Sequence, residues 1–232
     1  MGERVLARFA GPNGEIAVVE EASGARLYRE GGVNQSCVLP GGEAGVAYVR
    51  LMASLLEGSA SVLLLGCGGG ALAGMLHRRG SCVTVVDVNP LSFELARTFF
   101  WMPAGIECIA ADMSGFLRRD ARTFAGIGID VGGPDFSYEA ALAPATVGGV
   151  RRALQPRGRI AVNISCETPD DAMPGRIAQR FAEARLEVWM YMESGAPGSE
   201  ANAVILASNR RETAAELAAV AEAGWWLARL GG

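Results

Sequence analysis

The first forty residues alternate apolar and polar positions in short runs. The runs RVLARF, EIAVVEE, ARLYRE and VNQSCVL are separated by GPNG, ASG and GG. A period of two is typical of strands with one buried face, and the intervening Gly and Asn residues are typical of tight turns. We therefore expect residues 1–40 to form a small N-terminal β-hairpin region.

From residue 41 onward, apolar runs alternate with amphipathic stretches. A helix is expected over 42–57, and the continuous runs VLLLG, CVTVVD and IAVNIS indicate strands buried on both faces. Strands are then expected at 61–66, 82–88, 105–110, 125–131, 158–164, 187–193 and 202–208, and helices at 70–79, 90–100, 113–119, 142–154 and 172–184. This order predicts an α/β fold over 41–232 with a Rossmann-like, doubly wound, seven-stranded and mostly parallel sheet.

The stretch RRETAAELAAVAEAGWWLARL near the C-terminus is rich in Ala and Glu. It is predicted to be one amphipathic helix. Trp225 and Trp226 within it fit either core packing or a contact between copies of the chain.

Composition excludes several classes of function. The 21 Lys and Arg residues against 25 Asp and Glu give a net charge of -4, so no basic field favours nucleic acid as a partner. Residues 58–76 carry no charge over the length of a membrane span, but glycines interrupt the run. A buried strand, loop and helix is therefore expected there, with no membrane contact.

The N-terminus lacks the basic and then apolar layout of a secretory signal, so we expect a cytoplasmic protein. Five cysteines form no CxxC pair, and His77 is the single histidine. This set predicts buried thiols and no metal site.

Glycines follow the first strand of the predicted sheet. In VLLLGCGGGALAG, five of the nine residues from Gly66 to Gly74 are glycine. Gly66, Gly68 and Gly70 lie at the strand-to-helix turn, where bare main chain allows a ligand to approach and presents amide donors. Glycine-rich turns also serve packing, so this loop alone does not decide between the two uses.

Acidic residues end three neighbouring strands. Asp87 closes CVTVVD, 21 residues after Gly66, where a carboxylate can accept both ribose hydroxyls of a nucleoside; it also fits an acid that caps the next helix. Asp112 fits either the exocyclic amine of adenine or a helix N-cap. Asp130 closes the next strand at the same edge. Together these residues predict a nucleoside crevice.

The order VLLLGCGGG, VVDVNP, AADMSGFL, GIGIDVGGP resembles the class I S-adenosylmethionine-dependent methyltransferase fold. The hairpins, LYREGGVNQS, Tyr48, LARTFF and SGAPGSEANAVILAS narrow the resemblance to the spermidine synthase (polyamine aminopropyltransferase) family over residues 5–208. The resemblance implies that the glycines border the methionine-derived arm, that Asp87 binds ribose and that Asp112 faces adenine. It also implies that Gln35 borders the nucleoside, with Tyr48 and Asp130 on the acceptor side.

Four departures from the family pattern concern the acceptor and the aminopropyl group. The acid of the family's G-G-G-D-G-G loop is replaced by Gly69, and the last acid of D-S-S-D-P by Gly133. The acidic pair before the helix tyrosine is also missing, and Arg50 stands where the family has Glu. Because a diamine needs such counter-charges, these losses count against ordinary spermidine synthesis.

We therefore expect a transferase that binds S-adenosylmethionine or a close analogue and moves an alkyl group, favouring methyl, to a small-molecule acceptor. Asp130, Tyr48 and Asp135 are the expected catalytic residues, although Asp135 also fits a solvated loop acid. The expected product is S-adenosylhomocysteine, or methylthioadenosine if decarboxylated S-adenosylmethionine is the donor. Aminopropyl transfer and a catalytically silent nucleoside-binding module are the alternatives. A nicotinamide dehydrogenase shares the spacing of the acid but not the hairpins. Pairing into a homodimer is possible.

Overall fold

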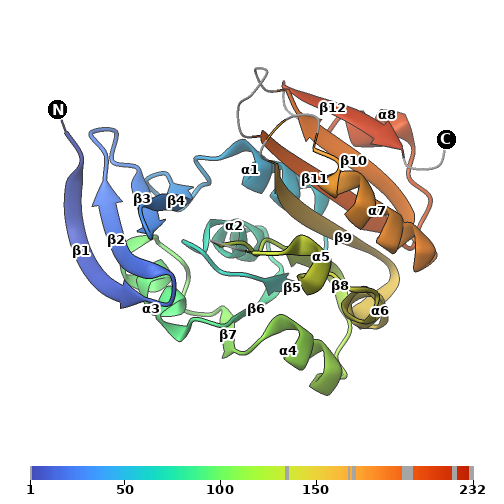
Figure 1. Cartoon of the computed structure of the whole chain (residues 1–232), viewed down its shortest axis with the longest axis horizontal. Coiled ribbons are helices and arrows are strands. Elements are labelled where there is room, and N and C mark those ends of the chain that lie inside the picture. The colour runs from blue at the N-terminus through green and yellow to red at the C-terminus, as the bar shows by residue number, and fades with distance from the viewer. Residues whose placement is uncertain are drawn as a thin grey trace.

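Two β-sheets organise the chain (Figure 1). The computed structural model describes residues 2–133, 136–166, 168, 171–194, 201–220 and 224–229. The N-terminal sheet is antiparallel in the order β1-β2-β3-β4, with bounds β1 Arg4–Gly11, β2 Gly14–Glu20, β3 Arg26–Glu30 and β4 Val33–Val38. These are the predicted hairpins. The division into domains at residue 40 stays a prediction.

The central sheet has eight strands in the order β12-β10-β11-β9-β8-β5-β6-β7. Five of them are parallel: β5 Ser61–Leu65, β6 Cys82–Asp87, β7 Glu107–Ala110, β8 Phe124–Ile129 and β9 Leu154–Cys166. Three antiparallel strands complete the sheet: β10 Glu187–Glu193, β11 Ala201–Ser208 and β12 Trp225–Arg229. The predicted α/β, mostly parallel fold is confirmed, with one strand more than expected.

Helices cover both faces of the central sheet. One face packs against α1 Ala47–Leu55, α2 Ala71–Arg78 and α3 Pro90–Phe99, and buried side chains of the N-terminal sheet join the same apolar cluster. The other face packs against α4 Met113–Arg119, α6 Pro144–Ala153 and α7 Met173–Glu183. The short α5 covers Tyr138–Ala141. This two-sided cover explains why the parallel strands read as continuous apolar runs.

The prediction of one helix near the C-terminus was wrong. Its first part forms α8 Ala214–Ala218, begun by a capping box between Thr213 and Glu216. The helix ends at Ala218, Gly224 has φ 101°, and the Trp-rich sequence after it forms β12 against β10. Aromatic residues favour this pleated setting over a helix surface.

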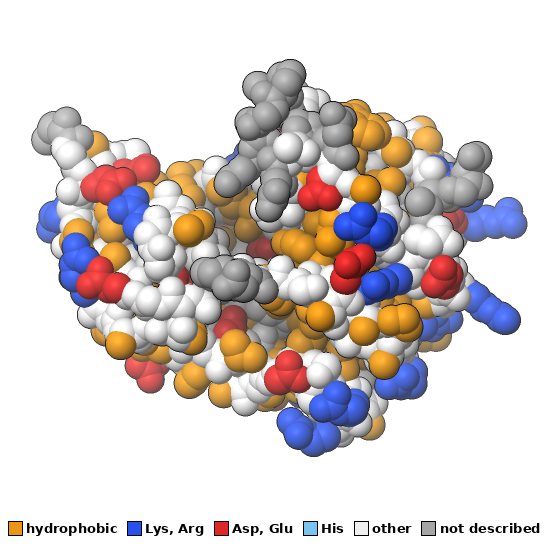
Figure 2. Space-filling model, in the orientation of Figure 1, with side chains coloured by type: hydrophobic (Ala, Val, Ile, Leu, Met, Phe, Trp, Pro, Cys, Tyr) orange, Lys and Arg blue, Asp and Glu red, His pale blue; other side chains and the backbone are white. Residues whose placement is uncertain are grey.

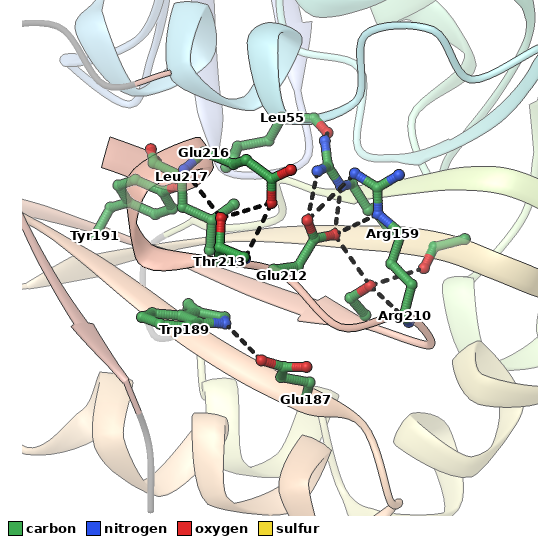
Figure 3. Close-up of polar contacts among 12 residues, drawn as sticks. Leu55, Arg159, Glu187, Trp189, Tyr191, Arg210, Glu212, Thr213, Glu216 and Leu217 are labelled. Atoms are coloured by element: carbon green, nitrogen blue, oxygen red, sulfur yellow. Dashed lines mark hydrogen bonds and ion pairs between the residues drawn. The ribbon is translucent and has the colours of Figure 1, made fainter. Parts of the chain in front are cut away.

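A buried ion cluster attaches this C-terminal segment to the central sheet (Figure 3). Glu212 accepts hydrogen bonds from Arg159 (Nη2 to Oε2, 2.7 Å) and Arg210 (Nε to Oε1, 2.7 Å). Arg159 also donates to the carbonyl oxygen of Leu55, 3.1 Å away, at the end of α1. The cluster therefore joins β9, α1 and the segment that leads into α8.

Residues 58–76 fold as β5, the glycine loop and the start of α2. Within the described ranges, every helix is too short or too polar to cross a lipid bilayer.

Candidate active site

Gly66, Asp87 and Asp130 meet at one edge of the central sheet. The amide of Gly66 donates to the carbonyl of Val86 (2.9 Å), and the amide of Asp130 donates to the carbonyl of Leu65 (2.9 Å). Since β6, β5 and β8 are parallel neighbours, their carboxyl ends lie side by side. Figure 2 shows this molecule hollowed between the N-terminal and central sheets, with acidic side chains visible inside the hollow.

The three predicted loop glycines all have positive φ: Gly66 103°, Gly68 50° and Gly70 72°. A Cβ atom at Gly66 would lie 2.0 Å from the carbonyl oxygen of Asp130, and one at Gly70 would lie 2.7 Å from Sδ of Met102. The tight turn and its packing therefore require glycine, whatever the ligand.

Asp87 fastens the glycine loop to the end of β6. Its Oδ2 accepts the amide of Cys67 and its Oδ1 accepts the amide of Asn89, each at 2.8 Å. Burial raises the pKa of Asp87, although these two bonds oppose the shift. A carboxylate accepts about four hydrogen bonds, so capacity for two hydroxyls is left. The next residue, Val88, is 68% exposed and offers an apolar surface beside it.

Sequence reasoning missed two buried residues of β3 near Asp87. Glu30 is 8% exposed and accepts the amide of Asn13 (3.1 Å), and its charge raises the pKa of Asp87 further. Burial and the nearby charges of Glu30 and Asp87 raise the pKa of Tyr28. Alternation in ARLYRE placed both residues in a strand but gave no sign that they approach the rim of another sheet.

Asp112 is the N-cap of α4. Its Oδ1 accepts the amide of Gly115 and the hydroxyl of Ser114, each at 2.7 Å. The Ser114 bond lowers the pKa of this exposed carboxyl. The capping role is thus present, and Oδ2 is left for any ligand; contact with adenine stays a prediction.

Gln35 lies in a β-bulge. Tyr28 pairs with Ser36 and Arg29 pairs with Asn34, so Gln35 is an extra residue in β4. Bulges near sites redirect side chains. Next to it, the hydroxyl of Ser36 accepts the amide of Gly69 (2.9 Å), which fixes β4 against the glycine loop.

Asp130 is the centre of a half-buried polar group formed by three elements. Its Oδ2 accepts the hydroxyl of Tyr48 from α1 (3.3 Å), and its Oδ1 accepts Nδ2 of Asn163 from β9 (3.0 Å). Burial raises the pKa of Asp130, and burial together with Asp130 raises that of Tyr48. The structure thus brings Tyr48 and Asp130 together, and their catalytic roles stay a prediction. Asn163 was missed, although an amide inside the apolar run IAVNIS is a usable signal.

Asp135 lies outside the described residues. Three residues further along the chain, the hydroxyl of Tyr138 accepts the amide of Ser165 (2.9 Å), and burial raises the pKa of Tyr138.

Two of the positions that depart from the family pattern have close neighbours. A Cβ atom at Gly69 would lie 3.0 Å from Val38, 3.2 Å from Cβ of Ser36 and 3.4 Å from Phe100, a setting without a positive charge for an acid. Nη1 of Arg50 donates to the carbonyl of Ala44 (3.1 Å).

Two cavities lie at different edges of the central sheet, one at the carboxyl ends of the parallel strands and one at their amino ends. One of about 30 Å³, lined by Tyr48, Asp130 and Gly66 among others, has room for on the order of two waters. A groove of about 640 Å³ lies at the amino ends of the parallel strands, away from the rim, and its Arg122 is bonded to Asp120 and Glu107. Among the described residues, no cluster of His, Cys, Asp and Glu side chains is placed to hold a metal ion.

No protein-family model and no curated protein matches the sequence. Solved structures do resemble the fold. A probable spermidine synthase from Corynebacterium glutamicum matches with a TM-score of 0.83 and 14% identity, over 97% of this chain and 91% of that one. A spermidine synthase in complex with the transition-state analogue AdoDATO matches at 0.67 and 16%, over 90% and 75%. A TehB-like SAM-dependent methyltransferase from C. glutamicum matches at 0.54 and 21%, over 72% and 89%. The chain therefore has the spermidine-synthase-like form of the class I methyltransferase fold.

Proposed function

We propose that the protein is a transferase that takes an alkyl group from a sulfonium nucleoside, S-adenosylmethionine or its decarboxylated form, and passes it to a small amine. One observation carries this proposal: the glycine loop, Asp87 and Asp130 lie at adjoining strand ends on one rim. In open parallel sheets, that rim is where ligands bind.

On the nucleoside side, Asp87 accepts the ribose hydroxyls with the capacity that its two backbone bonds leave. The glycine loop lies along the sulfur-bearing arm, Gln35 borders the nucleoside, and the free Oδ2 of Asp112 accepts the adenine amine. The AdoDATO complex of a spermidine synthase with the same fold supports a ligand of this class.

On the acceptor side, Asp130 attracts the ammonium form of the amine and takes its proton, and Tyr48 holds the carboxylate in place. The amine nitrogen then attacks the carbon next to sulfur. An N–C bond forms as the C–S bond breaks, and the electron pair leaves with the neutral thioether. Because the sulfonium carbon is already electrophilic, alignment supplies much of the rate. Burial raises the pKa of Asp130, which makes it a stronger base than an exposed Asp.

Aminopropyl transfer is the first candidate, because spermidine synthases of the same fold extend over most of this chain. Methyl transfer is the second. It is favoured by Gly69, whose apolar neighbours Val38 and Phe100 provide no counter-charge for an aminopropyl ammonium group.

The test is calorimetric titration with S-adenosylmethionine, decarboxylated S-adenosylmethionine and methylthioadenosine. Each donor is then incubated with 1,4-diaminobutane, and mass spectrometry identifies the product. A gain of one aminopropyl or one methyl group decides between the two candidates. If none of the three ligands binds, the proposal is overturned, and binding without transfer to 1,4-diaminobutane favours a silent nucleoside-binding module.

A further inference from the structure

Asn163 has a buried acceptor atom that the fold does not use. The side chain is 6% exposed, and Nδ2 donates to Oδ1 of Asp130. The other terminal atom, Oδ1, is buried and has no hydrogen-bond partner among the described residues. Buried polar atoms of this kind are nearly always paired, with protein, water or ligand.

The orientation of the amide follows from its neighbour. Turning it over would place its carbonyl oxygen against the carboxylate of Asp130, where two acceptors repel each other. Nδ2 therefore faces Asp130 and Oδ1 is the unused atom.

The groups around Asn163 indicate what kind of hydrogen-bond donor suits its Oδ1. Asp130 already receives one hydrogen bond from Tyr48 and one from Asn163, both from neutral donors, and no ion pair to Asp130 is present in the described part of the chain. Among the described residues, a carboxylate and an amide oxygen thus lie together without a cation. One ligand group that would satisfy both oxygens has two N–H donors, and a positive charge on it would suit the carboxylate.

We propose that Asn163 is a specificity-determining residue whose Oδ1 accepts an N–H of the acceptor amine while Asp130 accepts another, so that the site selects primary amines. This inference rests on the proposed function. A primary ammonium group has a proton for Asp130 and keeps an N–H for Asn163 after that proton has moved, with its lone pair free for the sulfonium carbon. A tertiary ammonium group has one N–H and cannot satisfy both oxygens.

The experiment compares amines on the protein saturated with methylthioadenosine. n-Butylamine and N,N-dimethylbutylamine are titrated into the wild type, Asn163→Leu and the control Thr84→Val. Leu removes both polar atoms of the side chain at similar volume. Thr84 is also a buried polar residue of the central sheet, bonded to Glu107, away from the rim.

We expect the wild type and Thr84→Val to bind the primary amine at least ten-fold more tightly than the tertiary amine. Asn163→Leu reduces this preference to less than two-fold. The affinity for methylthioadenosine stays within two-fold throughout.

An unchanged preference in Asn163→Leu overturns the inference, because a bound water then satisfies Oδ1. The absence of any preference in the wild type also overturns it, even if Asn163→Leu does not fold. Loss of methylthioadenosine binding in the wild type instead overturns the proposed function.

Discussion

At the scale of single residues, Asp87 has a structural role and, in our proposal, a ligand-binding one. Its oxygens hold the amides of Cys67 and Asn89, so the carboxylate shapes the glycine loop before any ligand arrives. The ribose in our proposal uses only the capacity that is left. A change at Asp87 therefore acts on both the loop and the ligand.

The first prediction concerns Asp87→Asn. We expect methylthioadenosine affinity to fall more than ten-fold, about 1.4 kcal/mol, because the amide loses an acceptor and opposes one backbone amide. Glu57→Gln, an exposed acid paired with Arg79, is the control and leaves affinity unchanged. Burial raises the pKa of Asp87 above its usual 3.8, so wild-type affinity should decline on acidification at a pH above that value. Equal affinity of the two variants in calorimetry contradicts the assignment.

The second prediction separates two costs of adding a side chain to a loop glycine. Gly66→Ala places Cβ 2.0 Å from the Asp130 carbonyl, so we expect a loss of about 3 kcal/mol or more in the free energy of unfolding. Gly58→Ala also has positive φ but open space around it, so about 1 to 2 kcal/mol is expected. Urea denaturation measures both, and similar losses would show that the contact with Asp130 does not matter.

The candidate site was predictable where a residue ends a strand. Gly66, Asp87 and Asp130 were found because parallel strands bring their carboxyl ends to one edge. Glu30 and Tyr28 were not found, since the pattern of a strand does not tell where its sheet docks. The role of Asp112 was ambiguous, because an aspartate between a strand and a helix can be either an N-cap or a ligand-binding acid.

At the scale of elements, β12 shows the limit of helical periodicity. Ala and Glu in 214–218 do form a helix, but Gly224 and the Trp pair behind it turn the chain into an edge strand. Local composition favoured one long helix. The hydrogen bonds offered by the free edge of β10 are a tertiary feature that composition does not contain.

The third prediction concerns the ion cluster that holds this element (Figure 3). Burial by itself raises the pKa of Glu212, but the bonds from Arg159 and Arg210 lower it to about 2. Ionised Glu212 therefore stabilises the fold above about pH 4.5, and this contribution is lost as the pH falls toward 2.

Glu212→Gln should thus lose about 3 kcal/mol at neutral pH, because Arg159 keeps a charge with no counter-ion. The variant should also lose less stability than the wild type between pH 4.5 and 2. Glu139→Gln, in an exposed pair with Arg176, is the control, with a change below about 1 kcal/mol. Parallel pH curves for wild type and Glu212→Gln in urea denaturation would rule out this role.

At the scale of the whole molecule, the order of apolar runs predicted the sheet, its parallel part and the hairpins. Each buried strand is specified by its own local composition, so it can be predicted from the sequence without knowledge of tertiary contacts. The contacts between the two sheets could not be predicted in this way. The hydrogen bond between Ser36 and Gly69 depends on how the N-terminal sheet docks on the central sheet. The approach of Glu30 to Asp87 depends on it as well.

Helix α1 is held at both ends by strand β9. Near its start, Tyr48 meets Asp130, which Asn163 also binds; at its end, Leu55 accepts the guanidinium of Arg159. Arg159 and Asn163 lie four residues apart on β9, about 13 Å along the strand. Helix α1 and strand β9 are thus linked at two points, with Tyr48 at one and Glu212 behind the other. In our proposal, changes far from every bound ligand can therefore alter turnover, because they alter the angle at which α1 presents the phenol of Tyr48.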